Sequence, residues 1–290
     1  MRQTSRVVLG SHSFSLSSIS RGVYPLSSAD SAVRKSNTLF VLGSSWDINC
    51  LSDEQWSVIA ENDSIAFNSW VRHSFVPSFY LIQDVSKESL ALFSKRNYDK
   101  TLFLLRGCSF GQSRPNVQLI EDLLSFARAC QVRTVVEFPI DRAFEELPPN
   151  DVVHLLSAMD ILRHGGISRV LPKFRGTLGM AVAFGYLMGY EKIVICGSNP
   201  KSPGYFWDKD KSIRRIDRKS HMEYLASELW TLESEWYMNN SQTSYIAAID
   251  ELMHSDGVGG VYSGSAVAAD YGLANFWGRL DALGAPNSTA

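Results

Sequence analysis

The stretch LGMAVAFGYLMGYEKIVICG, residues 178–197, decides the fold class of this 290-residue chain. Its first part is apolar on every side as far as Gly189, which is typical of a helix buried in a protein core. The segment EKIVICG at 191–197 follows directly and is apolar at successive positions. Strands of this kind belong to a parallel sheet that is covered by helices on both faces. The stretch therefore predicts one helix and one strand of an α/β fold.

Helix and strand patterns alternate along the rest of the chain in the same way. Further strands are predicted at 38–43, 63–70, 77–84, 100–107, 133–139 and 260–264, and helices at 51–60, 87–96, 116–131, 221–238 and 244–255. Ser52 and Gln55 have the spacing of a capping box at a helix start. We therefore predict a doubly wound, mostly parallel α/β sheet of Rossmann-like architecture, whose ligands bind outside the carboxyl ends of the strands.

Composition limits the domain organisation and the classes of partner. Hydrophobic residues make up 45% and charged residues 20% of the chain, as in ordinary globular proteins. Residues 37–290 suit a single α/β domain, and the serine-rich segment 1–36 is predicted to be accessory or flexible. A net charge of −2 gives no electrostatic reason to expect nucleic acid as a partner. No run approaches the ~18 apolar residues that a membrane-spanning helix needs.

Signatures of the common phosphate loops and metal sites are absent from the sequence. Neither G-x-G-x-x-G nor G-x-x-x-x-G-K-[ST] occurs, and there is no H-E-x-x-H. The four cysteines are far apart and include no C-x-x-C pair. The DKD triplet at 208–210 lies in a basic run rather than at a strand end. We therefore expect no metal and no cofactor.

Three polar loops that follow predicted strands are the first candidates for a ligand site. They are GSSWD at 43–47, the turn at Asn68, and GSNPKSPGYFWD at 197–208. Glycines, amides and hydroxyls at strand ends suit a base, a ribose and a phosphate better than a metal ion. The same residue types dominate ordinary turns, so a turn without a ligand remains the alternative for each loop.

Two further features favour an anionic ligand. Arg175 and Thr177 stand at the start of the buried helix, whose amino-terminal dipole attracts negative charge. A basic run at 208–221 ends at His221, an imidazole that can act as a general base near neutral pH. The alternatives are a simple helix cap at Thr177 and a solvated loop for the basic run.

Five motifs occur in this order along the chain: GSSWDI, FNSW, FRGTLGMAVAFGYLMGYEKIVICGSNP, GYFWD and SH. In this order they resemble the bacterial sialyltransferases of glycosyltransferase family 42, over about residues 38–240. The related pterin pyrophosphokinase-like proteins share the opening loop. The resemblance implies a GT-A-like variant of the α/β fold, and an inverting transfer that needs no metal.

The resemblance also implies a role for individual residues. His221 matches the base that deprotonates the acceptor hydroxyl, and Tyr205 matches a tyrosine that hydrogen-bonds the departing phosphate. The nucleotide-binding residues that it implies are Gly43, Ser44, Ser45, Asn68, Arg175, Thr177, Gly179, Ser198, Asn199 and Lys201.

The chain departs from the pattern of the family at several of these positions. Ser44, Ser45 and Trp46 replace an Asn-Gly-Pro. Leu178 replaces the serine of a T-S-G motif, and Asn199 replaces the acid of a G-I-D-F motif. Lys201 replaces a tyrosine and would bind phosphate as a point charge. Sialic acid, Kdo and other anionic sugars therefore stay open as the transferred sugar.

The leading hypothesis is an inverting, metal-independent glycosyltransferase that transfers an anionic sugar from a CMP-linked donor to a glycan acceptor in surface polysaccharide synthesis. The alternatives are a pyrophosphate-donor transferase, a relative of the pterin pyrophosphokinases, and a non-catalytic nucleotide-binding module.

The hypothesis carries several expectations about the rest of the protein. A lid over about 201–220 is expected to carry Tyr205, Phe206 and Trp207 onto the bound donor. We expect a cytoplasmic protein without a membrane span, and leave open a peripheral association with the inner membrane and the formation of a homo-oligomer.

Overall fold

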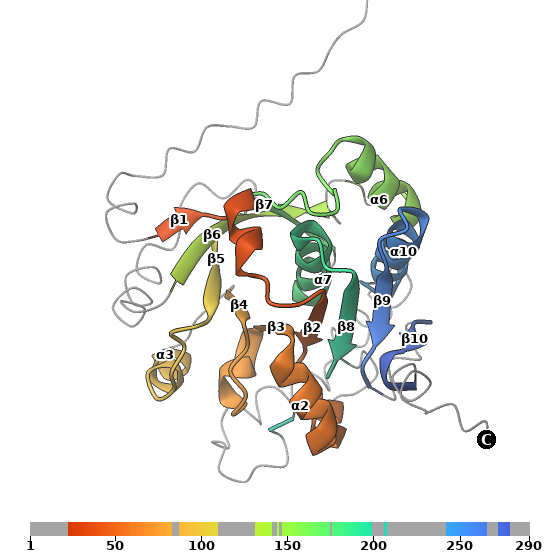
Figure 1. The fold of residues 1–290 in the computed structure, drawn as a ribbon. Helices are drawn as coiled ribbons and strands as arrows, with labels where there is room; N and C mark the ends of the chain where they lie inside the picture. Colours follow the sequence, from red (N-terminus) through yellow and green to blue (C-terminus); the bar gives the residue numbers. More distant parts are fainter. Residues whose placement is uncertain are drawn as a thin grey trace, which may run out of the picture.

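The computed structural model describes residues 23–82, 87–109, 131–140, 144, 147–174, 176–198, 206–207, 242–265 and 272–278. Its strands are β1 (Val23–Pro25), β2 (Thr38–Leu42), β3 (Asp63–Phe67), β4 (Phe79–Ile82), β5 (Leu102–Ser109), β6 (Gln131–Pro139), β7 (Val170–Lys173), β8 (Lys192–Cys196), β9 (Gly260–Ser263) and β10 (Ala274–Asn275). Its α-helices are α2 (Asp53–Glu61), α3 (Lys87–Phe93), α6 (Pro149–Ala158), α7 (Thr177–Met188) and α10 (Gln242–Ser255), and its 3₁₀ helices are η1 (Ser28–Val33), η2 (Trp46–Cys50) and η3 (Asn68–Arg72). Figure 1 shows these elements arranged around one central sheet.

The strands form a single sheet in the order β1-β6-β5-β4-β3-β2-β8-β9-β10, with β7 also paired to β6. Each of the described pairings is parallel. From β2 the chain proceeds outward through β3, β4, β5 and β6 to β7, and then returns to place β8 on the other side of β2. The direction of winding therefore reverses between β2 and β8, and the carboxyl ends of these two strands form the topological switch point.

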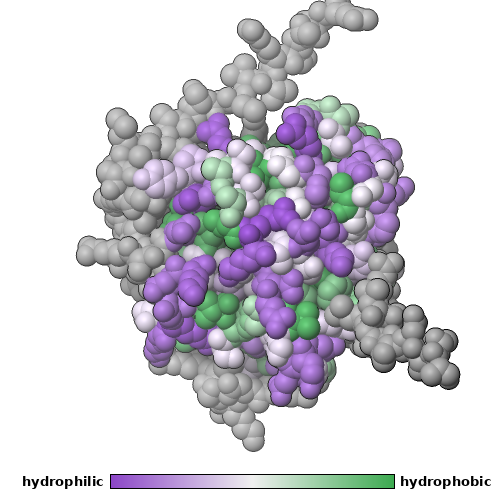
Figure 2. Space-filling model, viewed as in Figure 1, coloured by the Kyte–Doolittle hydropathy of each residue, from purple (hydrophilic) through white to green (hydrophobic). Residues whose placement is uncertain are grey.

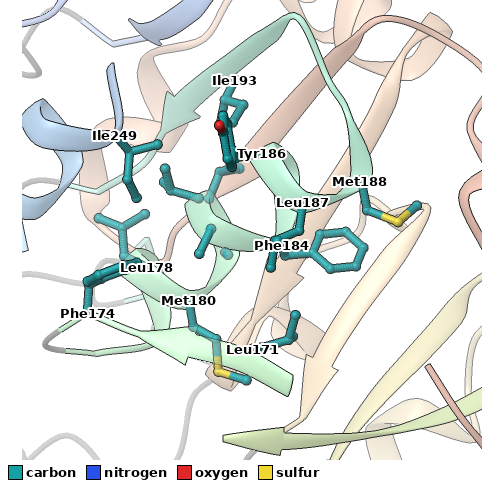
Figure 3. Close-up of a cluster of buried hydrophobic side chains, with 14 of the residues drawn as sticks. Leu171, Phe174, Leu178, Met180, Phe184, Tyr186, Leu187, Met188, Ile193 and Ile249 are labelled. Carbon is teal, nitrogen blue, oxygen red and sulfur yellow. The ribbon is translucent and has the colours of Figure 1, made fainter. Parts of the chain in front are cut away.

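Helices cover both faces of the sheet. Successive residues of a strand point to opposite faces, so the apolar strands present side chains to helices on both sides. Val41 joins a core cluster with α6, α7 and α10, and its neighbour Phe40 joins a second cluster with α2, η3 and α3. Every residue of α7 is buried. Figure 3 shows the apolar side chains of α7 among Leu171 of β7, Ile193 of β8 and Ile249 of α10. This two-sided burial explains why the strands carry apolar residues at successive positions.

The doubly wound parallel α/β fold expected from the sequence is confirmed. The buried helix ends at Gly189 as predicted, with a left-handed C-cap (φ 84°). The capping box of Ser52 and Gln55 is present at the start of α2. β3 is shorter than predicted: it ends at Phe67, because Asn68 adopts a positive φ and starts η3.

Several elements were not predicted, and some predictions cannot be compared with the structure. β1, α6, β7 and β10 have no counterpart among the predicted elements. The predicted helix at 221–238 lies outside the described residues, and so does that at 116–131 except for Gln131, which begins β6. Of the accessory segment 1–36, residues 1–22 lie outside them as well, whereas Val23–Pro25 pair with β6. The boundary at residue 36 stays a prediction.

Two further features of the described part of the chain are the polarity of its surface and the length of its helices. Hydrophilic residues cover most of the described surface in the view of Figure 2, with smaller hydrophobic areas between them. In the part of the chain that the structure describes, none of the helices has both the length and the apolar character that crossing a membrane requires.

Candidate functional site

Two glycines meet at the switch point, where the backbones of β2 and β8 approach each other closely. The Gly43 N–H donates to the Cys196 carbonyl (2.8 Å), and the Ser45 N–H donates to the Gly197 carbonyl (2.7 Å). A Cβ added to Gly43 would lie 2.3 Å from the Gly197 carbonyl oxygen. Gly197 itself has a φ of 63°, which side chains disfavour. Glycine is therefore required at both positions, because the two buried backbones contact each other there.

The loop after β2 is bound to a second loop from far along the chain. The Phe206 N–H donates to the Ser44 carbonyl (3.0 Å), and the Asn49 side-chain amide donates to the Phe206 carbonyl (3.1 Å). These bonds bring together two of the polar segments that the sequence indicated, GSSWD and GYFWD. Ser44 and Ser45 are both half-buried at this junction.

Asn68 connects the end of β3 to the start of α7. Its φ is 54°, in the left-handed region, and its side-chain oxygen accepts a hydrogen bond from the Thr177 hydroxyl (3.4 Å). Asn68 is exposed, whereas Thr177 is only 9% exposed. The residue before Thr177 is Gly176, which has no side chain to cap the helix. The site thus combines a strand-end amide with a helix amino terminus, an arrangement that favours anions.

Asp47 is a buried carboxyl group at the same edge of the sheet. Its side chain lies in η2, is 6% exposed, and neither of its oxygens has a hydrogen-bond partner in the described structure. Burial raises the pKa of Asp47. The Ser265 hydroxyl partly offsets this increase, although the two groups do not meet the geometry of a hydrogen bond.

The Cys196 thiol lies near this carboxyl group, at the end of β8. Burial and, secondarily, the charge of Asp47 raise the pKa of the Cys196 thiol far above its usual range. The thiol is therefore protonated at neutral pH and is a poor nucleophile. Asp47 was part of the GSSWD motif but was assigned no role, because its burial depends on residues that are distant in the sequence.

The turn at Phe206 and Trp207 packs against aromatic and cationic groups of the protein. The Phe206 ring lies edge-on to Trp70 (5.5 Å between centroids) and to His73 (5.2 Å). The Arg72 guanidinium lies 5.5 Å from the centre of the Trp207 ring. Burial and, to a smaller extent, the charge of Arg96 lower the pKa of His73 to about 4, so this imidazole is neutral at physiological pH. The predicted stacking of Phe206 and Trp207 on a donor stays a prediction.

The sequence-predicted site residues fall into three groups. Gly43, Ser44, Ser45, Asn68, Thr177 and Ser198 all lie at the carboxyl edge of the sheet, around the switch point. Gly179 lies within α7, where an added Cβ would be 2.2 Å from the Phe174 carbonyl oxygen, so packing alone requires glycine there. The remaining residues lie outside the described part of the chain: Arg175, Asn199, Lys201, Tyr205 and His221.

The comparisons with known proteins find likenesses among solved structures. No model of a protein family matches the chain, and no curated protein matches it. The sialyltransferase CstII from Campylobacter jejuni, in complex with the substrate analogue CMP-3FNeuAc, is 11% identical with a TM-score of 0.41, over 82% of this chain and 85% of that one. The monofunctional α-2,3-sialyltransferase Cst-I from the same organism is 12% identical with a TM-score of 0.40, over 82% and 80%.

A third match is the sialyltransferase CST-II in complex with a trisaccharide acceptor and CMP. It is 12% identical with a TM-score of 0.40, over 82% of this chain and 86% of that one. These three solved structures are all sialyltransferases, the class of protein that the sequence motifs resemble. At these identities and TM-scores the likeness concerns the course of the backbone and assigns no activity.

Proposed function

We propose that this protein is an inverting glycosyltransferase that uses a nucleotide-activated anionic sugar, CMP-linked, as its donor. The observation that carries the proposal is that the loop after β2, the amide of Asn68 and the amino terminus of α7 lie at the carboxyl edge of the sheet, next to the switch point. Crevices at such switch points are where open α/β sheets bind nucleotides.

Polar groups at the carboxyl edge suit a nucleoside. The hydroxyls of Ser44 and Ser45, which are half-buried, and the exposed amide of Asn68 offer donors and acceptors to a base or ribose. Gly43 and Gly197 act indirectly, because their close contact positions the loop that carries the two serines. This mode of nucleotide binding differs from that of a triphosphate loop, in which a lysine follows a glycine-rich turn.

The start of α7 suits the phosphate of a nucleoside monophosphate. The first amide N–H groups of a helix carry a partial positive charge, and no side chain at Gly176 competes for them. The Thr177 hydroxyl lies 3.4 Å from the amide of Asn68, so one ligand can contact both residues. Transfer then needs stabilisation of a single departing phosphate, which helix amides and hydroxyls provide electrostatically.

The chemical step follows from the resemblance to glycosyltransferase family 42. His221 takes the proton from the acceptor hydroxyl, and the resulting oxygen nucleophile attacks the anomeric carbon of the donor sugar. The new glycosidic bond forms as the bond from that carbon to the phosphate oxygen breaks, and CMP leaves with the electron pair. Tyr205 donates a hydrogen bond to the departing phosphate. The acceptor on this proposal is a glycan of surface polysaccharide synthesis, at the cytoplasmic side of the inner membrane.

Titration calorimetry with CMP, CDP, UDP, GDP, ADP and phosphoribosyl pyrophosphate, with and without magnesium, tests the proposal. We expect binding of CMP without magnesium by the wild type and by the His221→Ala variant. Transfer from a CMP-linked sugar should be lost in His221→Ala, because only the base is removed. His254→Ala is the matched control: His254 lies exposed on α10, where its ring contacts the Asp250 carbonyl, and transfer should be unchanged.

Two outcomes would overturn the proposal in different ways. Binding only of pyrophosphate ligands, or only with magnesium, would favour a pyrophosphate-donor transferase or a pterin pyrophosphokinase relative. Binding of CMP without hydrolysis or transfer of any CMP-linked sugar would indicate a nucleotide-binding module.

A further inference from the structure

One tyrosine hydroxyl contacts both ends of the turn that follows β3. The Tyr80 hydroxyl donates a hydrogen bond to the Asn68 carbonyl (2.8 Å) and accepts one from the Val71 N–H (2.8 Å). These two backbone groups are three residues apart, so they are the carbonyl and the amide between which a tight turn closes. A side chain of β4 therefore participates in a turn whose backbone belongs to η3.

This turn holds Asn68 in a conformation that ordinary residues avoid. Its φ of 54° lies in the left-handed region, which asparagine tolerates better than most residues but which still has an energetic cost. Such a conformation persists where surrounding contacts determine it. The contact with the Tyr80 hydroxyl is made at the carbonyl of Asn68 itself, directly next to the affected backbone angles.

The position of that hydroxyl is set by a rigid aromatic cluster. Tyr80 is 1% exposed, and its ring packs against Phe93 (5.0 Å between centroids), Phe103 (5.9 Å) and Tyr98 (6.4 Å). Burial raises the pKa of Tyr80 well above that of a free tyrosine, so the hydroxyl keeps its proton. It can therefore donate to the Asn68 carbonyl over the whole physiological pH range.

The conformation of Asn68 has a consequence at the candidate site. With the backbone in the left-handed region, the side-chain oxygen of Asn68 accepts the hydrogen bond from the Thr177 hydroxyl at the start of α7 (3.4 Å). A change of φ at Asn68 would swing this amide away from α7, because the side chain leaves the same Cα.

We infer that Tyr80 is a positioning residue for the candidate nucleotide site: its hydroxyl holds Asn68 in the left-handed conformation that directs the amide to the amino terminus of α7. The identity of the ligand in this inference rests on the proposed function. The geometric part, in which Tyr80 holds Asn68, does not depend on it. Tyr80 touches no ligand in this scheme and acts only through Asn68.

A double-variant cycle with CMP as the probe tests the inference by calorimetry. Tyr80→Phe should raise the Kd for CMP about five- to tenfold, because it removes both hydrogen bonds of the hydroxyl, to the Asn68 carbonyl and from the Val71 N–H. Tyr98→Phe is the matched control in the same aromatic cluster and should leave the Kd within about twofold. A twofold change in Kd corresponds to a binding free energy difference below ~0.5 kcal/mol. In an Asn68→Gly background, which removes the amide and tolerates a positive φ, Tyr80→Phe should have no further effect.

Equal losses of affinity from Tyr80→Phe in the wild-type and Asn68→Gly backgrounds would overturn the inference, because the tyrosine would then act by another route. A second readout needs no ligand. The side-chain ¹H–¹⁵N signals of Asn68, identified by their loss in Asn68→Gly, should shift in Tyr80→Phe and stay in place in Tyr98→Phe. Unchanged Asn68 signals in Tyr80→Phe would also overturn it. If wild type binds no CMP, the proposed function fails and these signals alone decide the role of Tyr80.

Discussion

A buried aspartate lies at each edge of the central sheet, and the two carboxyl groups differ in the hydrogen bonds that they accept. Asp63 begins β3 at the amino edge and is fully buried. Its Oδ2 accepts hydrogen bonds from the backbone N–H groups of Lys35 (2.7 Å) and Ser36 (3.2 Å) and from the Tyr190 hydroxyl (2.9 Å), whereas its Oδ1 has no partner among the described residues. Asp47 follows β2 at the carboxyl edge, and in the described structure no donor reaches either of its oxygens.

This difference indicates what each edge is built for. At the amino edge, three donors on one carboxylate oxygen offset the cost of removing its charge from water. At the carboxyl edge, no described residue offers a hydrogen bond to either oxygen of the buried Asp47. Proteins depart from local rules of stability mainly at functional sites. The comparison therefore agrees with the proposed ligand site at the carboxyl edge.

The largest expected effect concerns Asp63. Asp63→Ala should lower the free energy of unfolding by about 3–4 kcal/mol, because two backbone amides and one hydroxyl lose a charged acceptor. Asp47→Ala should change it by no more than about 1 kcal/mol, because no hydrogen bond from a described residue is lost. Urea denaturation at pH 7.5 measures both values. Equal losses in the two variants would mean that the edges do not differ in this way.

The next effect concerns the close approach of backbones at the switch point. Gly197→Ala should cost about 3 kcal/mol, because the new Cβ would lie 2.6 Å from the Gly43 carbonyl oxygen and the residue has a positive φ. Gly257→Ala is the matched control: Gly257 has a φ of 67° but no atom within 4 Å of the added Cβ. It should cost only the backbone strain, about 1 kcal/mol.

The difference between these two glycine variants measures the crowding at Gly197, which comes from the Gly43 carbonyl and from Ile48. The same denaturation series measures it, and calorimetry with CMP shows whether this close packing also matters for the ligand. If Gly197→Ala were no more destabilising than Gly257→Ala, the neighbouring groups would have room to move apart, and close packing would not be what requires glycine at the switch point.

The sequence predicted best those features that depend on local chemistry. Apolar runs identified β2, β3, β4, β5, β6 and β8, and Gly189 marked the end of α7 because a left-handed C-cap favours glycine. It did not predict β7, because the strand Val170–Lys173 is four residues long and contains Pro172. β1 has only three residues and depends on pairing with β6.

Only part of the candidate site was predicted, because the sequence shows local chemistry but not contacts between distant segments. Strand-end loops with glycine and serine were recognisable, and the parallel sheet brings their carboxyl ends to one edge. The contact of Asn68 with Thr177 spans 109 positions of sequence, and no local pattern reports it. Tyr80 was assigned only to an apolar strand, because nothing in its neighbourhood showed that its hydroxyl would join another segment. The isolation of Asp47 likewise appears only when distant elements pack around it.

The smallest expected effect is the change of protein stability with pH that the buried Asp47 causes. Burial raises the pKa of Asp47 in the folded protein above its value in the unfolded chain, so the folded state retains a proton that the unfolded state releases. The wild type therefore loses stability as pH rises from the ordinary aspartate pKa of about 4 toward neutrality. Asp47→Asn removes this charge and should be more stable than the wild type by about 1 kcal/mol at pH 7.5.

This advantage should shrink as the pH falls toward about 4, because the wild-type carboxyl group is then neutral in both states. Urea denaturation of both proteins between pH 4 and pH 7.5 measures the difference. A variant that is less stable than the wild type at pH 7.5 would mean that the Asp47 carboxylate has a favourable partner, and the contrast with Asp63 would fail. A stable variant that binds CMP less tightly would show that the ligand, rather than the fold, is what the carboxyl group serves.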